Sequence, residues 1–339
     1  MPVWRAPGSR SRRRWWGVLV NPFPRLGYLL FRSFETAVLS LPYPTAVAVS
    51  RHFGAFVHAV DRKHRKTGRK NLARAFPEWP ERRIRASLRR TYEHFTLVIF
   101  EMFFTQRLVR RSNLDRYATF VGYENVERAL AEGKGLIVVV GHFGNWEFAA
   151  YAGALRGMRL TSIARPLNNR WINDHLVRMR TQTGQEVVYK RDALRRMIGC
   201  LREERVLVIP SDQNVRENGV FVPFFGRPAS TQRSAALLSL KYGAPLLVAT
   251  HHRTTPGRFH HRIEFSPPLY PAQFDRAEDP LQEMTAQFTR RLEGKIREHP
   301  QQYLWMHKRW KTRPPEEEAE RERRRASSNA ERRTSAVNG

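Results

Sequence analysis

The pattern that most constrains the fold is an alternation of short apolar runs with helical segments between residues 118 and 298. The run 135–141 contains Leu, Ile and three Val residues in succession, as buried parallel strands do. Similar runs predict strands at 159–164, 186–189, 206–210, 245–251 and 262–265. The segments between them predict helices at 123–133, 145–155, 171–183, 193–203, 231–242 and 281–298. Strands that alternate with helices form largely parallel sheets, so we expect an α/β domain whose sheet is flanked by helices.

A helical region is expected before this domain. Residues 26–56 predict a helical hairpin that is broken at the segment Pro42-Tyr-Pro44. A longer helix is predicted from about 81 to 104, because its apolar residues recur at helical spacing. The second half of that helix is strongly apolar, which is consistent with core burial or with a membrane-facing stripe. No run of 18 uncharged apolar residues occurs, so we expect any membrane attachment of residues 26–60 to be peripheral or hairpin-like.

The two ends of the sequence differ from the rest in composition. Residues 1–22 combine basic residues with Trp15 and Trp16, which is consistent with a membrane-surface anchor or with a disordered leader. Residues 314–339 are charged, polar and free of aromatic residues, so we expect a disordered tail. We therefore divide the chain into a leader (1–22), a helical region (23–110), an α/β domain (111–313) and the charged tail.

The net charge of +29 predicts attraction to an anionic partner, which can be nucleic acid, lipid headgroups or an acidic protein. No nucleic-acid-binding motif is present, and the basic residues are not interleaved with a stacking platform, so no nucleic acid partner is expected. The single cysteine, Cys200, excludes an internal disulfide and a cysteine-ligated metal site. The pairs His251-His252 and His260-His261 alternate between strand faces and are predicted to be surface residues. No His, Asp and Glu cluster has metal-ligand spacing, so we expect no metal and no cofactor.

The residues that most suggest chemistry are His142 and Glu147, in the segment Gly141-His-Phe-Gly-Asn-Trp-Glu147. His142 directly follows a predicted buried strand, and the carboxyl ends of such strands are where α/β sheets bind ligands. The two glycines permit a sharp turn, and Asn145 is placed to cap the next helix. Across this turn Glu147 can hold one imidazole nitrogen while the other takes a proton from a hydroxyl group. The alternative is a structural histidine beside a glutamate favoured by the helix dipole.

The segment 141–147 resembles the active-site motif of the bacterial lipid A late acyltransferases, the lauroyl and myristoyl transferases of the lysophospholipid acyltransferase superfamily. An N-terminal match is Asn71-Leu72 with Phe76-Pro77. Further matching blocks follow in the family's order at 164–169 (Ala-Arg-Pro-Leu-Asn-Asn), 211–214 (Ser-Asp-Gln-Asn), 222–231 (Val-Pro-Phe-Phe-Gly-Arg-Pro-Ala-Ser-Thr), 243–245 (Gly-Ala-Pro) and 299–310. The resemblance covers roughly residues 45–312. The family begins with a clearer transmembrane helix than residues 26–60 provide.

The resemblance implies an O-acyltransferase at the cytoplasmic face of the bacterial inner membrane, either peripheral or anchored by its N-terminal segment. It implies acyl carrier protein thioester as the donor, and as the acceptor a hydroxyl of a membrane glycolipid, with a lipid A precursor as the leading candidate. His142 is then the general base and Glu147 its partner. The alternative is the same chemistry with acyl-CoA as donor, or with a lysophospholipid or another membrane lipid as acceptor.

The resemblance also implies a set of substrate-binding residues. Arg165 would bind a phosphate or steady the carbonyl group, and Asp212 and Gln213 would line the same cleft. Structural alternatives remain, namely a surface ion pair for Arg165 and a loop cap for Asp212. Thr231 could likewise be only a helix N-cap. The remaining residues of the predicted substrate-binding set are Gly144, Asn145, Arg227 and Thr231.

Overall fold

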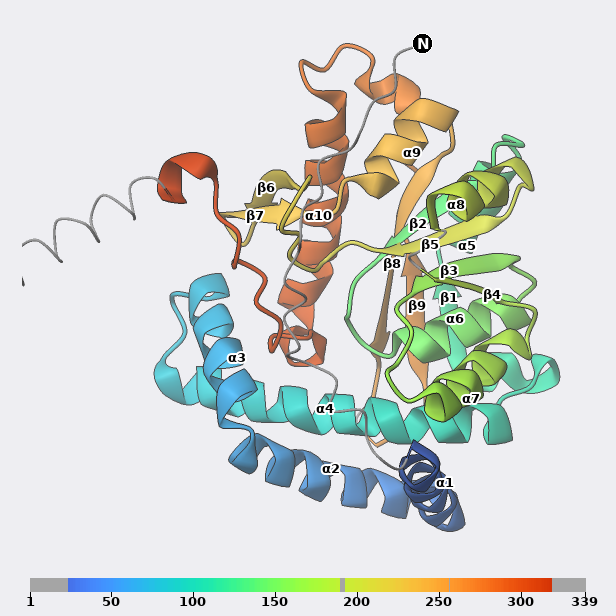
Figure 1. Ribbon diagram of the computed structural model, residues 1–339, viewed down its shortest axis with the longest axis vertical. Coiled ribbons are helices and arrows are strands. Elements are labelled where there is room, and N and C mark those ends of the chain that lie inside the picture. Colours follow the sequence, from blue (N-terminus) through green and yellow to red (C-terminus); the bar gives the residue numbers. More distant parts are fainter. Residues whose placement is uncertain (1–23, 190–192, 256, 319–339) are drawn as a thin grey trace, which may run out of the picture.

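The computed structural model of the protein describes residues 24–189, 193–255 and 257–318 (Figure 1). The predicted leader lies outside these residues, as do residues 319–339 of the predicted tail. Residues 315–318, which we expected to be disordered, form a helical turn. The first half of the chain contains α1 (Pro24–Ser40), α2 (Tyr43–Val60), α3 (Arg62–Ala75), α4 (Glu81–Leu108), β1 (Ala118–Val121), α5 (Tyr123–Leu130), β2 (Leu136–Val140), α6 (Trp146–Leu155) and β3 (Leu160–Ala164). The second half contains α7 (Arg170–Thr181), β4 (Glu186–Tyr189), α8 (Ala193–Arg202), β5 (Val206–Pro210), β6 (Val220–Phe224), β7 (Arg227–Thr231), α9 (Ser234–Tyr242), β8 (Leu246–Arg253), β9 (His261–Phe265) and α10 (Pro280–Glu298).

Seven strands form one sheet in the order β1-β9-β8-β2-β5-β3-β4. The pairing of β8 with β9 is antiparallel, and the other five pairings are parallel. The predicted α/β fold with a largely parallel sheet is therefore confirmed. Strand β2 lies between two parallel neighbours, β5 and β8, and helices cover both faces of the sheet (Figure 1). Burial on both faces explains why the β2 sequence is continuously apolar rather than alternating.

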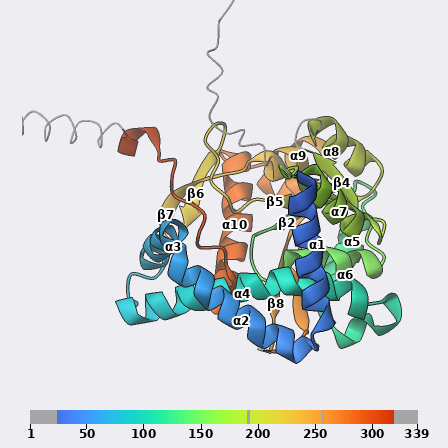
Figure 2. The same cartoon turned by 60° about the horizontal axis from the view of Figure 1, so that its bottom comes forward.

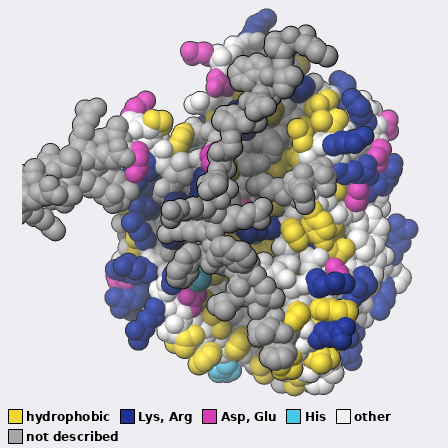
Figure 3. Space-filling model, viewed as in Figure 1, with side chains coloured by type: hydrophobic (Ala, Val, Ile, Leu, Met, Phe, Trp, Pro, Cys, Tyr) yellow, Lys and Arg dark blue, Asp and Glu magenta, His cyan; other side chains and the backbone are white. Residues whose placement is uncertain are grey.

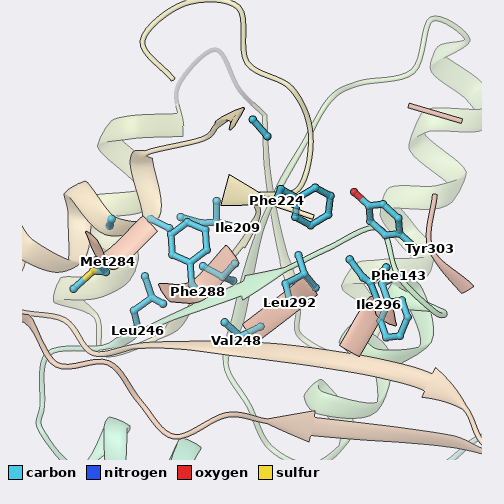
Figure 4. Packing of buried hydrophobic residues seen from close by; sticks show 14 of the residues in the cluster. Phe143, Ile209, Phe224, Leu246, Val248, Met284, Phe288, Leu292, Ile296 and Tyr303 are labelled. Carbon is cyan, nitrogen blue, oxygen red and sulfur yellow. The ribbon is translucent and has the colours of Figure 1, made fainter. Parts of the chain in front are cut away.

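The two faces of the sheet build two hydrophobic cores, because successive side chains of a strand point to opposite faces. Ile137 and Val139 of β2 join the core that includes residues of α8, α9 and α10. Figure 4 shows residues of this core, among them Phe288 and Leu292 of α10, packed close to the sheet. Leu136 of β2 joins the opposite core, to which α5, α6 and α7 contribute. The site described below lies on this second face.

Helix α4 connects the two cores. Ile84 and Leu88 in its first half belong to one core, and Phe100 and Phe103 in its second half belong to the other. The helix predicted from 81 to 104 is therefore confirmed and extends to Leu108. Core burial accounts for most of its apolar residues.

The predicted break at Pro42 is also confirmed, since it separates α1 from α2. Both of these helices pack against α4 (Figure 2). None of the helices in the described part of the chain combines the length and the hydropathy needed to cross a membrane. The division of the chain near residue 110 stays a prediction.

The local structure differs from the predictions in four places, each for a physical reason. The strands β6 and β7 form an antiparallel hairpin that the sequence analysis missed. Its two-residue turn, Phe225-Gly226, has positive φ angles of 52° and 68°. Asn or Asp at the first of these positions would have predicted a turn, whereas an apolar Phe does not. Because β7 ends at Thr231, the helix predicted from 231 begins only at Ser234. Helix α3 was missed because its sequence is mostly basic and lacks a clear apolar stripe.

The histidines of β8 and β9 are the fourth difference. We expected surface positions, but His251, His252 and His261 are 2%, 6% and 0% exposed. The alternation rule assumes that one face of a strand meets water, whereas every residue of β8 is buried. Burial lowers the pKa of His251 to about 3, so this ring is neutral at neutral pH.

Candidate active site

The loop between β2 and α6 carries His142, and Gly144 fixes its shape. Gly144 has a φ of +63°, and an added Cβ would lie 1.8 Å from the carbonyl oxygen of His251. Its N–H donates to the carbonyl oxygen of Gln302 at 2.8 Å, and its own carbonyl oxygen lies 3.2 Å from Nε2 of His94. Gly144 is buried, so the structure corrects the expectation that it contacts substrate. This glycine lets the loop approach β8 closely.

The segment near the C-terminal end of the fold holds the same loop from its other side. Leu304 N–H donates to the carbonyl oxygen of His142 at 3.0 Å. Phe143 and Tyr303 form an isolated antiparallel bridge, and both side chains are buried in the core drawn in Figure 4. The position of the His142 backbone therefore depends on two segments that are far apart in the sequence, the loop after β2 and the segment around Tyr303.

Asp212, which follows β5, is the carboxylate bonded to His142. Its Oδ1 lies 2.8 Å from Nδ1 of His142, and its Oδ2 accepts the backbone N–H of His142 at 2.8 Å. The Asp212 side chain is 2% exposed, while the His142 side chain is 24% exposed. The ring of His142 is thus fixed at Nδ1 and reachable from outside. This arrangement leaves Nε2 as the nitrogen that can exchange a proton with a ligand.

The electrostatics of this pair are set by burial and by charge. Burial lowers the pKa of His142, but the charge of Asp212, the hydrogen bond between Asp212 and the ring, and the charge of Glu147 together outweigh burial, so the net pKa is raised above its ordinary value. Burial raises the pKa of Asp212, but the His142 charge and two hydrogen bonds from His142 outweigh it and leave that pKa lowered. Both shifts favour an ion pair of imidazolium and carboxylate. The pair therefore stabilises a proton on His142.

Glu147 does not contact His142 in the expected way, and this corrects the pairing predicted from the sequence. Its Oε2 accepts from Nε of Arg180 at 2.9 Å, and its Oε1 accepts from Nη2 of Arg180 at 2.5 Å. The indole N–H of Trp146 also donates to Oε1 at 3.2 Å. Glu147 sits in the first turn of α6 and turns toward α7, where a bidentate arginine satisfies it. Its charge still raises the pKa of His142, as a smaller contribution than that of Asp212.

A cavity of about 270 Å³ opens beside His142 and runs between the sheet and α6. Its polar lining is His142, Glu147, Arg180, Arg165, Ser162 and Gln185, together with the ring of His251. Its apolar lining comes from β2, β3, β5, β8, β9, α6 and the connection from α6 to β3, and includes Val138, Ala149, Ala150, Met158, Leu160 and Val206. Val138 and Leu160 precede the carboxyl ends of their strands, so the apolar part extends away from His142. The cavity thus has a charged part beside His142 and an apolar channel beyond it.

The other predicted site residues fall into two groups. Arg165 follows β3, lines the cavity and is exposed. Gln213 follows Asp212, and its Nε2 lies 3.3 Å from Nε2 of His142. Strands β2, β3 and β5 therefore deliver His142, Arg165 and the pair Asp212 and Gln213 to one edge of the sheet, as parallel strands do.

Besides Gly144, three predicted residues are not in position to contact a ligand in this cavity. Asn145 is 0% exposed, and both ends of its amide are bonded inside the protein. Thr231 is also 0% exposed, and its hydroxyl accepts from Nη2 of Arg309 at 2.6 Å. Arg227 is exposed at the start of β7, in the hairpin, and does not line the cavity. Burial and internal hydrogen bonds indicate structural roles for Asn145 and Thr231.

Sequence reasoning missed Arg180 and the true partner of His142. Arg180 lies 33 residues after Glu147 and Asp212 lies 70 residues after His142, so no local spacing connects them. The sequence predicts Asp212 as a cleft residue, because it is a polar residue just after a buried strand, but does not identify it as the partner of His142. Within the described ranges, no group of three or more His, Cys, Asp and Glu side chains could hold a metal ion.

The sequence is similar to a known protein family and to several known proteins. The model of a family described as bacterial lipid A biosynthesis acyltransferase matches residues 24–312. The chain is 26% identical over 286 residues to the lipid A biosynthesis palmitoleoyltransferase of Escherichia coli strain K12, covering 81% of this chain and 88% of that one. It is 25% identical to the lipid A biosynthesis lauroyltransferase of the same organism, covering 82% and 89% of the two chains.

Two further similarities are more limited. A phosphatidylinositol mannoside acyltransferase of Mycobacterium tuberculosis is 28% identical over 187 residues, which cover 53% of this chain and 58% of that one. Among solved structures, the 1-acyl-sn-glycerophosphate acyltransferase of Thermotoga maritima aligns with a TM-score of 0.34 and 18% identity, over 74% of this chain and 94% of that one.

The His142 pair predicts a measurable titration. The titration can be followed by NMR of histidine-labelled protein. The His142 ring should titrate with a pKa above the ordinary value of about 6.5. In Asp212→Asn the pKa should fall, because burial remains and the opposing charge is gone. Glu147→Gln should lower the pKa by a smaller amount. An unchanged His142 pKa in Asp212→Asn would contradict the described electrostatics.

Proposed function

Because the chain belongs to the bacterial lipid A biosynthesis acyltransferase family, we propose that it transfers a fatty acyl chain from an acyl carrier protein thioester to a hydroxyl of a membrane glycolipid, a lipid A precursor. That the chain is an acyltransferase follows from its family and its relatives. The observation that carries the finer proposal is the pairing of His142 with buried Asp212 beside an apolar cavity.

In the proposed reaction His142 is the general base. Asp212 holds Nδ1 as the protonated nitrogen, so Nε2 accepts the proton of the acceptor hydroxyl. The hydroxyl oxygen attacks the thioester carbonyl carbon, and the C–S bond of the resulting tetrahedral intermediate breaks. The imidazolium returns its proton to the leaving thiolate, which departs as a thiol. An ester is formed, a thioester is consumed, and His142 ends as it began.

The polar residues around His142 have separate proposed roles. Asp212 stabilises the imidazolium that forms during the reaction. Gln213, whose Nε2 lies 3.3 Å from Nε2 of His142, is proposed to contact the acceptor. Arg165 is proposed to bind a phosphate, because no ion pair occupies its guanidinium group among the described residues. Glu147 is proposed to hold Arg180 beside the reacting groups through the bidentate contact.

The apolar channel is proposed to hold the acyl chain. It lies between the sheet and α6 and begins beside His142, so a chain inside it would present its carbonyl end to the base. Burial of each CH₂ group contributes about 0.8 kcal/mol. Gly153 of α6 lines this channel, and a Cβ added there would lie 3.1 Å from Sδ of Met158 and 3.6 Å from Cδ1 of Leu160.

A second candidate uses the same chemistry on another membrane lipid. The similarity to a mannoside acyltransferase favours it, since that relative's name specifies an acceptor other than lipid A. An acyl-CoA donor belongs to the same candidate. Mass spectrometry of the lipids made by the purified protein from mixed donors and acceptors separates the two functions.

The N-terminal helices are proposed to bind the membrane surface. Most of the large hydrophobic side chains that are exposed lie on α1 and α2, and basic helix α3 follows directly. In Figure 3, hydrophobic side chains gather at the lower edge over these two helices, with Lys and Arg on both flanks. An apolar face bordered by basic residues is suited to an anionic lipid surface. The apolar residues are Leu26, Leu29, Leu30 and Phe34 of α1 and Val49, Phe53, Phe56 and Val60 of α2.

The base mechanism predicts the pH dependence of turnover. Only neutral His142 accepts a proton, so kcat/KM should fall as the pH drops through its raised pKa. His142→Ala should abolish turnover of an acyl carrier protein thioester, and Asp212→Asn should lower the rate by about 10²–10⁴. The remaining activity of Asp212→Asn should have its acid limb at lower pH. Turnover by His142→Ala at the wild-type rate would refute the mechanism.

The acyl channel predicts a change of chain-length preference in Gly153→Leu. The new side chain should fill the channel near Met158 and Leu160, so kcat/KM for the longest accepted chain should fall by about fourfold for each excluded CH₂. Shorter chains should be affected less. Gly294→Leu on α10, where nothing lies within 4 Å of an added Cβ, is the matched control. An equal loss for all chain lengths would count against an acyl chain in this channel.

The membrane surface predicts the effect of replacing Phe53 and Phe56, which are 45% and 60% exposed. The double replacement by Ser should weaken binding to vesicles containing anionic lipid by about 10-fold or more, because aromatic burial is lost. Leu237→Ser on α9, at a position 43% exposed, should bind like the wild type. Vesicle sedimentation measures both. Equal binding by all three proteins would exclude this surface.

A further inference from the structure

We propose that Glu101 is a positioning residue for acyl transfer, which acts through Asn145 to fix the start of α6 and the loop that carries His142. Glu101 belongs to α4, outside the motif segments, and does not line the cavity. The inference rests on the proposed function for its readout, since it concerns the rate of the same reaction.

Glu101 is at the centre of a buried network that joins four parts of the fold. Its carboxylate is 0% exposed and forms an ion pair with Arg253 of β8, in which Nη2 donates to Oε2 at 2.8 Å. Nη1 of Arg253 donates to Oε1. The hydroxyl of Tyr43, at the start of α2, donates to Oε1 at 2.8 Å. Nε2 of His261 on β9 lies 3.4 Å from Oε2.

The fourth contact of Glu101 reaches the active-site loop. Nδ2 of Asn145 donates to Oε2 of Glu101 at 3.0 Å. At the other end of the same amide, Oδ1 of Asn145 accepts the N–H of Phe148 at 3.0 Å and caps α6. An ionised carboxylate can only accept, so it fixes which end of the amide faces α4 and which end caps the helix. Glu101 therefore locks the side chain that sets the first turn of α6.

Stability alone is a weak reason for this ion pair. Burial raises the pKa of Glu101, but Arg253 and His261 outweigh burial and keep the pKa low, so the carboxylate is ionised. Taking two charges out of water costs free energy, and well-packed apolar residues of similar size are often as stabilising or more so. The carboxylate oxygens of Glu101 do provide directed hydrogen-bond acceptors at a point where α2, α4, β8 and the loop that carries His142 meet. Directionality is what positioning requires.

The position of α6 determines the geometry around the base. Trp146, the first residue of α6, packs its ring against His142 with centroids 5.2 Å apart. The next residue, Glu147, holds Arg180. A rotated Asn145 would therefore displace Trp146 and Glu147 together. Misplacement by about 1 Å can cost about 10²-fold in rate.

The test is a double-mutant cycle measured on kcat with an acyl carrier protein thioester and a glycolipid acceptor. Asn145→Ser keeps a good helix cap but has too short a side chain to reach Glu101. We expect kcat to fall by about 10-fold or more, with KM for the donor within about twofold of wild type. Because Glu101→Gln leaves a buried arginine without its carboxylate, the paired replacement Glu101→Leu with Arg253→Met supplies the second side of the cycle.

If Glu101 acts through Asn145, the paired replacement should lower kcat, and adding Asn145→Ser to it should cause little further loss. Additive losses would overturn the proposal, as would a kcat within about twofold of wild type in either variant.

Tyr43→Phe is the matched control, because it removes another hydrogen bond to Glu101 without touching the loop. It should lower the melting temperature by a few degrees and leave kcat unchanged, and a kcat loss as large as that of Asn145→Ser would also overturn the proposal.

The inference and the proposed function fail in distinguishable ways. Turnover by His142→Ala at the wild-type rate would refute the base mechanism. An inactive His142→Ala protein together with a fully active Asn145→Ser protein would leave that mechanism intact and refute positioning by Glu101.

Discussion

The carboxylate of Asp212 ties together the carboxyl ends of β2 and β5, since one oxygen accepts the backbone N–H of His142 and the other faces its ring. A carboxylate so deeply buried is stable only where donors satisfy it. The backbone of His142 must therefore adopt the turn that Gly144 makes possible by its close approach to β8. The direction of the His142 ring, its raised pKa and its access to the cavity all depend on this contact.

A second buried carboxylate, Glu101, stands behind the same loop and differs in its partners. Asp212 faces an imidazole that can gain or lose a proton, whereas Glu101 faces an arginine that stays charged. The first pair can change its charge during a reaction, and the second provides a fixed support. Helix α4 brings that support from the side of α1 and α2, whose exposed apolar residues form the proposed membrane surface. The chain thus places a buried charge network between α1 and α2, which carry the proposed membrane surface, and His142, the proposed base.

Much of the fold could be predicted from the sequence, because continuous apolar runs such as 135–141 have few alternatives to a buried strand. His142 could be located for the same reason, as the polar residue that ends such a run. Its partner could not, because Asp212 and Glu147 are both suitable carboxylates and 70 residues separate Asp212 from the histidine. The hairpin at Phe225-Gly226 and the buried histidine His251 were missed because turn geometry and two-sided burial depend on neighbours that local patterns do not describe. Asn145 matched the family motif yet binds only protein groups, so a motif match did not identify a ligand contact.

The central claim is that an acyl chain lies between the sheet and α6 with its carbonyl carbon beside His142. A crystal structure of the protein with a non-hydrolysable acyl thioester analogue tests this claim most directly. The acyl chain should lie in the channel lined by Val138, Gly153 and Leu160, with room for an acceptor oxygen about 3–3.5 Å from the carbonyl carbon and within hydrogen-bonding reach of Nε2. An acyl chain bound outside this channel, or a carbonyl group turned away from His142, would contradict it.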